Sequence, residues 1–217
     1  MKCLIQFKFL LEVYRLHGVI EMLQVAWSGL INKGGNRLIL LALKKPRKIE
    51  RALQLSKDHD FHFATVEELS AFKGLAEYDI EEFSVDWLRR GIARCLLQMD
   101  GDKLTGYAWV WNSKLAYIID GVYINLPAQA IYNFKALTLP EYRGCGYQGL
   151  RHLKLLELLK AEGVDQLFGY VHHLNTRSLH GVKKSGYEKV GELNIRHRRG
   201  LVQSKLTLKP SFWSGVE

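Results

Sequence analysis

The stretch A-L-T-L-P-E-Y-R-G-C-G-Y-Q-G, residues 136–149, decides how this chain is interpreted. An apolar segment runs into Pro140, an Arg- and Gly-rich turn follows, and a helical pattern begins at Leu150. A glycine turn that leads into a helix presents backbone N–H groups without intrahelical partners, together with the positive end of the helix dipole. The stretch therefore predicts an anion site, to which Arg143 adds charge-assisted hydrogen bonds. The apolar stripe of the helix is predicted from Leu150, Leu153, Leu156 and Leu159, with Leu155 and Leu158 beside them.

The common nucleotide-binding motifs do not fit this turn. The chain has no G-x-x-x-x-G-K-[ST] segment, which excludes a P-loop. The glycines of the turn are also not followed by the acidic residue that a dinucleotide-binding fold requires at the end of a neighbouring strand.

The residues downstream complete a second pattern. The helix that Arg143-Gly144-Cys145-Gly146 opens is predicted to end at Gly163, and a strand over Leu167–Val171 leads to Asn175, with Ser178 three positions later. The segment Lys184-Ser185-Gly186-Tyr187 closes the pattern. In order and in spacing it resembles the GNAT (acyl-CoA N-acyltransferase) superfamily, whose motifs read strand-x-P-x-x-(R/Q)-G-x-G-x-(G/A), helix, strand, N-x-x-(A/S) and K-x-G-(F/Y). The resemblance extends over residues 61–208 and is strongest over 136–191.

The resemblance implies an α+β fold. A central, mostly antiparallel sheet would be splayed between two strands, here Ala130–Leu139 and Leu167–Val171, and flanked by helices. We expect a helical extension and linker over residues 1–58, followed by the acyltransferase domain over residues 59–210.

Residues 1–32 read as one or two amphipathic helices. Charged residues interrupt every apolar run, so no segment approaches the ~18 residues that a membrane span needs, and Lys8 breaks a secretory apolar region. We expect this segment to pack on its own domain or on a second subunit of a homodimer. The alternative is a helix at a membrane surface, held by the basic residues between Lys33 and Lys48. Arg37–Leu43 is an apolar run that periodicity assigns to neither strand nor helix.

Other elements have clear local signals. Thr65 and Glu68 form a capping box at the start of a helix, and a second helical pattern covers Ile80–Arg90. By the resemblance, these two helices form one wall of the acceptor site. Asp100-Gly101-Asp102 predicts a hairpin between strands Ala93–Met99 and Leu104–Trp111.

Composition and charge limit the class of protein. The chain has 217 residues and a formal net charge of +9, which favours an acidic partner such as a phosphorylated cofactor, an anionic lipid or a nucleic acid. Nucleic acid ranks last, because no recognised binding module accompanies the charge. The three cysteines lie far apart without a C-x-x-C pair, which predicts neither a metal site nor a disulfide framework and favours the reducing cytoplasm.

The resemblance assigns residues to the acyl-CoA site. Leu137 and Thr138 would contact the pantetheine and the acyl carbonyl, and Asn175 would bond the pantetheine arm. Gln148 departs from the family pattern, which has Gly or Ala at that position. The pyrophosphate would be held by the backbone amides of Arg143, Gly144, Cys145, Gly146, Tyr147, Gln148 and Gly149.

The chemistry that the resemblance implies is direct attack of an amine on a thioester, which needs a base, an oxyanion donor and an acid for the leaving thiolate. The acid of the family is often a tyrosine seven residues after the asparagine, and that position here is Val182. Candidates to replace it are Ser178 and His180. Candidates for the base are His172 and His173, where the second splayed strand ends, with Tyr132, Asp120 and Glu141 as weaker ones.

The sequence therefore predicts a cytoplasmic, metal-independent transferase. It would move an acetyl group from acetyl-CoA, or another acyl group from its acyl-CoA, to a primary amine of a small molecule or an amino sugar. One alternative is a long-chain acyltransferase that uses acyl-CoA or an acyl carrier protein. The other is a catalytically degenerate module that only binds CoA. The acceptor stays open, because one fold of this kind serves many acceptors.

Overall fold

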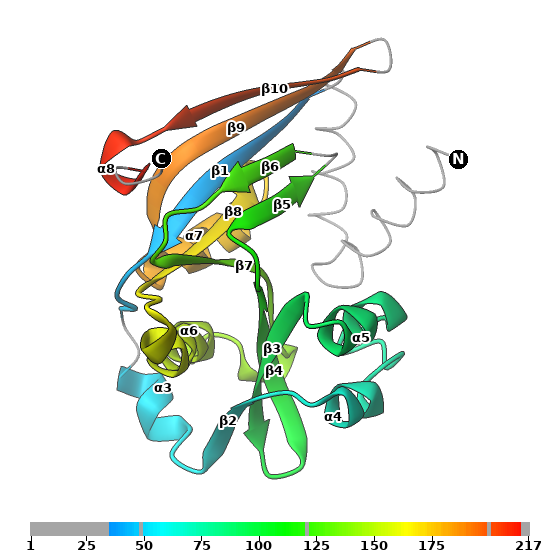
Figure 1. The fold of residues 1–217 in the computed structure, drawn as a ribbon. Helices are drawn as coiled ribbons and strands as arrows, with labels where there is room; N and C mark the ends of the chain where they lie inside the picture. The colour runs from blue at the N-terminus through cyan, green and yellow to red at the C-terminus, as the bar shows by residue number, and fades with distance from the viewer. Residues whose placement is uncertain (1–34, 48–49, 120–121, 199–200, 214–217) are drawn as a thin grey trace.

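The protein is organised around one eight-stranded sheet (Figure 1). The computed structural model describes residues 35–47, 50–119, 122–198 and 201–213, so the helices predicted within residues 1–32 lie outside it. The strand order is β10-β9-β1-β8-β7-β4-β3-β2, and every neighbouring pair is antiparallel except β7 and β8. The predicted α+β class with a mostly antiparallel sheet is confirmed. The strands of the sheet are β1 (Gly35–Leu43), β2 (His59–Phe63), β3 (Ala93–Asp100), β4 (Lys103–Trp111), β7 (Ala130–Thr138), β8 (Gln166–His172), β9 (Glu188–Arg198) and β10 (Leu201–Leu208).

Helices cover both faces of this sheet. On one face, α6 and α7 pack against a core that includes Leu41, Ile131 and Leu167. On the other face, α4 and α5 pack over the half of the sheet that contains β3 and β4. No helix within the described ranges is long and apolar enough to cross a membrane. The helices are α3 (Glu50–Leu55), α4 (Val66–Ala71), α5 (Glu82–Arg89), α6 (Tyr147–Leu159), α7 (Thr176–Lys184) and α8 (Pro210–Trp213), with short 3-10 turns at Pro140–Tyr142 and Lys160–Glu162.

A separate hairpin completes the second face. β5 (Leu115–Ile119) pairs with β6 (Val122–Asn125), and their buried residues join a core with Phe168 and Leu193 of the main sheet. The Tyr170 hydroxyl of β8 donates to the Ile118 carbonyl at 3.2 Å. The hairpin therefore covers the β8, β1 and β9 side, where α4 and α5 do not reach (Figure 1).

The N-terminal part of the described chain supplies an inner strand. β1 pairs with β8 along one edge and with β9 along the other. Leu38 and Leu40 enter the core on the hairpin face, whereas Leu41 and Leu43 enter the core on the α6 face. A strand buried on both faces is apolar without alternation, which is why the sequence pattern did not separate strand from helix here. Part of the segment predicted as a helical extension, residues 1–58, is thus integral to the sheet.

Several local predictions are confirmed. Thr65 accepts a hydrogen bond from the Glu68 amide while the Glu68 carboxylate accepts from the Thr65 amide, which is the expected capping box of α4. Gly101 turns the β3–β4 hairpin with a φ of +58°. Asn175 is the N-cap of α7, and its side-chain oxygen accepts from the Ser178 amide at 2.9 Å.

Burial of β1 predicts its contribution to stability. Leu40 is 0% exposed, so Leu40→Ala should lower the free energy of unfolding by roughly 2–5 kcal/mol in urea titrations. Leu206→Ala on β10 is the matched control, because Leu206 is 42% exposed and should cost far less. Equal losses in the two variants would contradict the inner position of β1.

Candidate active site

The parallel pair at the centre of the sheet separates part of the way along. β7 and β8 are in register only at Ala130↔Gln166, Ile131↔Leu167 and Tyr132↔Phe168, and no later pair joins these two strands in the described chain. A β-bulge lies at the point of separation. On β4, Val110 pairs with Asn133 and Trp109 pairs with Lys135, which leaves Phe134 as the extra residue. Because a bulge bends the strand that carries it, this one accounts for the divergence of β7 from β8.

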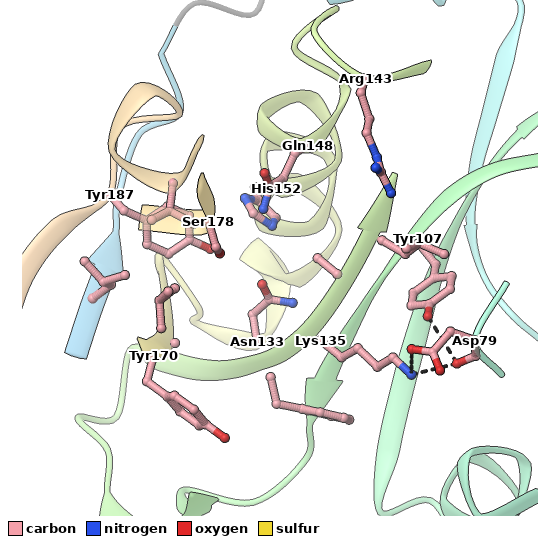
Figure 2. Close-up of a pocket in the computed structure, with 17 residues that line it drawn as sticks. Asp79, Tyr107, Asn133, Lys135, Arg143, Gln148, His152, Tyr170, Ser178 and Tyr187 are labelled. Carbon is pink, nitrogen blue, oxygen red and sulfur yellow. Dashed lines mark hydrogen bonds and ion pairs between the residues drawn. The ribbon is translucent and has the colours of Figure 1, made fainter. Parts of the chain in front are cut away.

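Between the diverging strands lies a cleft with a volume of about 310 Å³ (Figure 2). Its walls come from Asn133–Leu137 of β7 and Gly169–Val171 of β8, and from α6 and α7. The lining residue Val182 belongs to the core on the α6 face, whereas Tyr107 belongs to the core under α4 and α5. The cleft therefore runs through the sheet from one face to the other.

The predicted glycine turn stands at the α6 end of this cleft. Gly144 and Gly146 have φ angles of +81° and +86°, a conformation that glycine adopts without Cβ strain. Gly146 is the N-cap of α6, and the amides that begin the helix point out of it without intrahelical partners. Arg143 and Gln148 both line the cleft. A parallel strand pair that opens beside such a helix start is the arrangement that the sequence resemblance implied. The chain thus has the splayed strand pair beside a helix start that the resemblance to GNAT proteins predicts.

Comparisons with known proteins find similar solved structures only at low sequence identity. No protein-family model matches this sequence, and no curated protein matches it either. A putative acetyltransferase from the GNAT family from Novosphingobium aromaticivorans is 16% identical, with 81% of this chain and 65% of that chain covered and a TM-score of 0.49. AAC(6')-Iy in complex with a bisubstrate analogue is 14% identical, with 60% and 91% covered and a TM-score of 0.47. Ribosomal-protein-alanine N-acetyltransferase from Brucella melitensis biovar Abortus 2308 is 16% identical, with 58% and 86% covered and a TM-score of 0.42. None of them is similar enough to transfer a substrate to this chain.

The residues predicted to bind acyl-CoA divide into two groups. Leu137, Arg143 and Gln148 line the cleft, and Gly144, Cys145, Gly146 and Gly149 form the turn and the first turn of α6. The others have structural partners. The Thr138 hydroxyl accepts from the Arg151 guanidinium. Tyr147 turns away toward α3, where its hydroxyl donates to the Leu55 carbonyl at 3.4 Å. Asn175 uses its side-chain oxygen to cap α7.

Of the residues predicted to be catalytic, Ser178 lines the cleft and the rest of the described ones do not. Burial, followed by the charge of His173, lowers the pKa of His172, whose Nδ1 accepts from the Leu174 amide at 3.3 Å. His173 Nδ1 lies 3.0 Å from the Arg37 carbonyl oxygen, and His180 is exposed on α7.

Tyr132 belongs to the aromatic core behind the cleft. It is 3% exposed, and burial, followed by the neighbouring Tyr170, raises its pKa strongly. Glu141 is exposed and pairs with Lys103 at 3.1 Å, and Asp120 lies outside the described residues.

His152 is a cleft residue that the sequence analysis missed. It is 1% exposed, and neither ring nitrogen has a hydrogen-bond partner among the described residues. Its ring packs edge-on against Tyr187, with 5.4 Å between the centroids. Burial, followed by the charge of Arg151, lowers the pKa of His152 to about 3, so the imidazole is neutral at pH 7 and carries one donor and one acceptor. Unpartnered polar atoms at such depth are rare in proteins and point to a missing partner.

The stripe predicted for α6 explains why His152 was missed. The structure leaves Leu153 half-buried and Leu158 44% exposed, and buries Arg151 and His152 instead. The predicted stripe is confirmed at Leu150, Leu155, Leu156 and Leu159. A row of residues three apart drifts around a helix that has 3.6 residues per turn, so the stripe departs from the buried face at Leu153 and Leu158. The only signal in the sequence was a pair of polar residues inside a leucine-rich helix.

Arg151 fixes the neighbouring edge of the cleft. Its guanidinium is fully buried, donates to the Gln98 oxygen at 2.8 Å and holds the Thr138 hydroxyl at the end of β7. Burial lowers its pKa to about 9, which still leaves it charged at neutral pH. Gly106 makes room for it, because a Cβ there would lie 2.5 Å from Arg151 Nη1.

An ion pair lies at the opposite end of the cleft, under α4 and α5 (Figure 2). Lys135 Nζ lies 2.6 Å from Asp79 Oδ2 and donates to the Asp79 carbonyl oxygen at 2.6 Å. The Tyr107 hydroxyl donates to the same carbonyl oxygen at 3.4 Å. Asp79 has a φ of +50°, the only positive value at a non-glycine residue in the described part of the chain. No local sequence pattern predicts this pair, since Asp79 lies in an irregular loop.

The depth of His152 predicts a pH dependence of stability. An unfolded histidine has a pKa of 6.5, so between pH 6.5 and about pH 3 the unfolded chain binds a proton that folded His152 does not. Stability should therefore fall as the pH falls, by roughly 1.5–2 kcal/mol between pH 6.5 and pH 5 from this residue. Urea titrations of His152→Leu should show a flatter pH profile by that amount. His180→Gln, which removes an exposed histidine, is the control; a profile unchanged in His152→Leu would contradict the burial.

Proposed function

We propose that the protein is an acyl-CoA-dependent N-acyltransferase that moves an acetyl group from acetyl-CoA to a primary amine of a small molecule. One observation carries the proposal. The cleft between β7 and β8 is lined by Arg143 and by Gln148 at the start of α6, so one cavity joins a helix N-terminus to an unpaired strand edge. A thioester attached to a long, amide-containing arm and a diphosphate has the chemistry that such a cavity accommodates.

The residues present fit this cofactor. The amides at the start of α6 would hold the diphosphate, with Arg143 beside them. Arg177 of α7 is close enough to lower the pKa of Arg143, after burial, and adds positive charge at the same end. The edge of β7 beyond Tyr132 offers backbone N–H and C=O groups to the amides of the arm, as strand edges do for extended peptides. The two free nitrogens of His152 face the same cleft.

The chain's own groups would act on an activated acyl group that the cofactor supplies. A backbone N–H of β7 near Leu137 is suited to bond the developing oxyanion, because that edge of the strand is unpaired toward β8. Val182 provides no acid, but Tyr187 and Ser178 line the cleft beside it. Burial raises the pKa of Tyr187, so its phenol is protonated at neutral pH and is available as a hydrogen-bond donor toward the leaving thiolate.

One binding experiment distinguishes acetyl-CoA from the alternative acyl donors and tests whether the protein binds CoA at all. No structural feature favours a long acyl chain or an acyl carrier protein over acetyl-CoA. Loss of the tyrosine at position 182 is the one feature that favours a module that only binds CoA. Calorimetric titrations with acetyl-CoA, a long-chain acyl-CoA and free CoA would rank the donors, and absence of binding to all three would overturn the proposal.

The diphosphate site is testable with two matched glycines at opposite ends of α6. Gly144 and Gly163 have φ angles of +81° and +75°, and a Cβ at either would meet no atom within 4 Å. Gly144→Asp should weaken acetyl-CoA binding by roughly 10–100-fold, because its carboxylate faces the diphosphate. Gly163→Asp adds the same charge and a similar backbone strain at the other end of α6, so it should leave the affinity for acetyl-CoA unchanged. Equal affinities of the two variants would contradict the position of the site.

If Tyr187 acts on the leaving thiolate, its removal should slow turnover without weakening the binding of acetyl-CoA. Tyr187→Phe should lower kcat by roughly 10–100-fold, the size of effect typical of a general acid, with little change in the Kd for acetyl-CoA. Steady-state rates measured with a free-thiol reagent give kcat, and calorimetry gives the Kd for acetyl-CoA. Ser178→Ala, tested in parallel, separates the two hydroxyls: a loss confined to Ser178→Ala would assign the acid to that residue instead.

A further inference from the structure

The α4–α5 end of the cleft has a charge arrangement that the cofactor does not use. Among the described residues that line the cleft, three belong to the Arg, Lys, Asp and Glu class: Arg143 at the α6 end, and Lys135 and Asp79 at the other. Asp79 is the one carboxylate of that lining. The side chains of Lys135 and Asp79 are 29% and 18% exposed, so the pair is only partly hydrated.

The pair is held in place from two sides. Lys135 projects from β7 and bonds both the carboxylate and the backbone carbonyl of Asp79, and the Tyr107 hydroxyl of β4 bonds that carbonyl as well. The Asp79 carboxylate meets Lys135 through Oδ2, and Asp79 is among the residues that line the cleft. A non-glycine residue with positive φ is kept only where its surroundings enforce it, and such residues concentrate at functional sites.

We infer that this end of the cleft binds the acceptor, and that the acceptor is an amine which also carries a carboxylate, as an amino acid does. The inference rests on the proposed N-acyltransferase function. The ammonium of the acceptor would bond Asp79, and its carboxylate would bond Lys135.

The acceptor must carry both a positive and a negative group because the Asp79–Lys135 ion pair is partly buried. A purely cationic amine that approached Asp79 would meet the ammonium of Lys135 about as closely and would leave one cation without a counter-charge. Removing a partner from a partly desolvated charge is costly, whereas exchanging both partners keeps every charge paired. An acceptor with one positive and one negative group can exchange both, and a polyamine cannot.

A nearby ion pair shows what a merely structural link looks like. Lys73 and Glu82 connect α4 to α5 outside the cleft, with side chains 40% and 69% exposed. Asp79 and Lys135 join the same helical wall to the sheet, but they are deeper and face the cavity. Depth and cavity lining therefore distinguish the pair that meets the acceptor from the pair that does not.

The test compares free amino acids with their own carboxamides. Acetyl transfer from acetyl-CoA would be measured for the common amino acids and, for each, the carboxamide of the same side chain. The wild-type protein should use at least one free amino acid with a kcat/KM roughly tenfold or more above that of its carboxamide. Lys135→Met should abolish this preference, and Asp79→Asn should raise KM for both forms. Glu82→Gln is the matched control and should behave as wild type.

Calorimetry can measure how tightly the preferred amino acid binds to the complex of the protein with CoA. This measurement does not depend on turnover. Asp79→Asn and Lys135→Met should each weaken this binding roughly tenfold while leaving the affinity for CoA unchanged. Unchanged CoA affinity also shows that the variants are folded. Equal or better use of the carboxamides, or use of other amines only, would overturn the inference and leave the proposed function standing. Loss of acetyl-CoA binding in the wild-type protein would instead overturn the proposed function.

Discussion

The divergence of β7 from β8 is the constraint on which the rest of the site depends. After three paired positions, each strand keeps one partner and gives up the other: β7 stays with β4, and β8 stays with β1. Unpaired strand edges inside a protein are unfavourable unless something satisfies their polar groups. The bulge at Phe134 enforces the separation, and the Asn133 side chain reinforces it by donating to the Trp109 carbonyl at 2.8 Å. The fold thus maintains an opening that it does not fill by itself.

The two ends of this opening differ in chemistry. At the α6 end, helix amides and Arg143 favour anions. At the α4–α5 end, Asp79 and Lys135 offer one charge of each sign. Between them, Val182, Tyr187 and His152 form a wall that is mostly apolar but carries a phenol and an imidazole. In the proposed reaction, donor and acceptor would approach from opposite faces of the sheet and meet at the strands, beside this buried wall.

Much of this arrangement follows from local sequence signals. The glycine turn, the start of α6, the Asn175 cap and the Thr65–Glu68 capping box each depend on residues within a few positions of one another, and each is found where the sequence predicts it. Asp79 and Lys135 are 56 positions apart, so no local pattern contains their contact. The chemistry of His172 and His173 and their position at the end of β8 predicted a catalytic base, but neither side chain lines the cleft.

The place of β1 in the sheet has a consequence for how the molecule assembles. Gly35 lies opposite Arg196, and Leu38 lies opposite His172, so β1, the first strand of the described residues, can pair along both edges only after β8 and β9 have been synthesised. Contacts between such distant segments carry a large loop-closure cost and slow the search for the native topology. During synthesis, the leucine-rich ribbon of β1 would emerge well before β8 and β9, and would need shielding from premature association until the ribosome has released most of the chain.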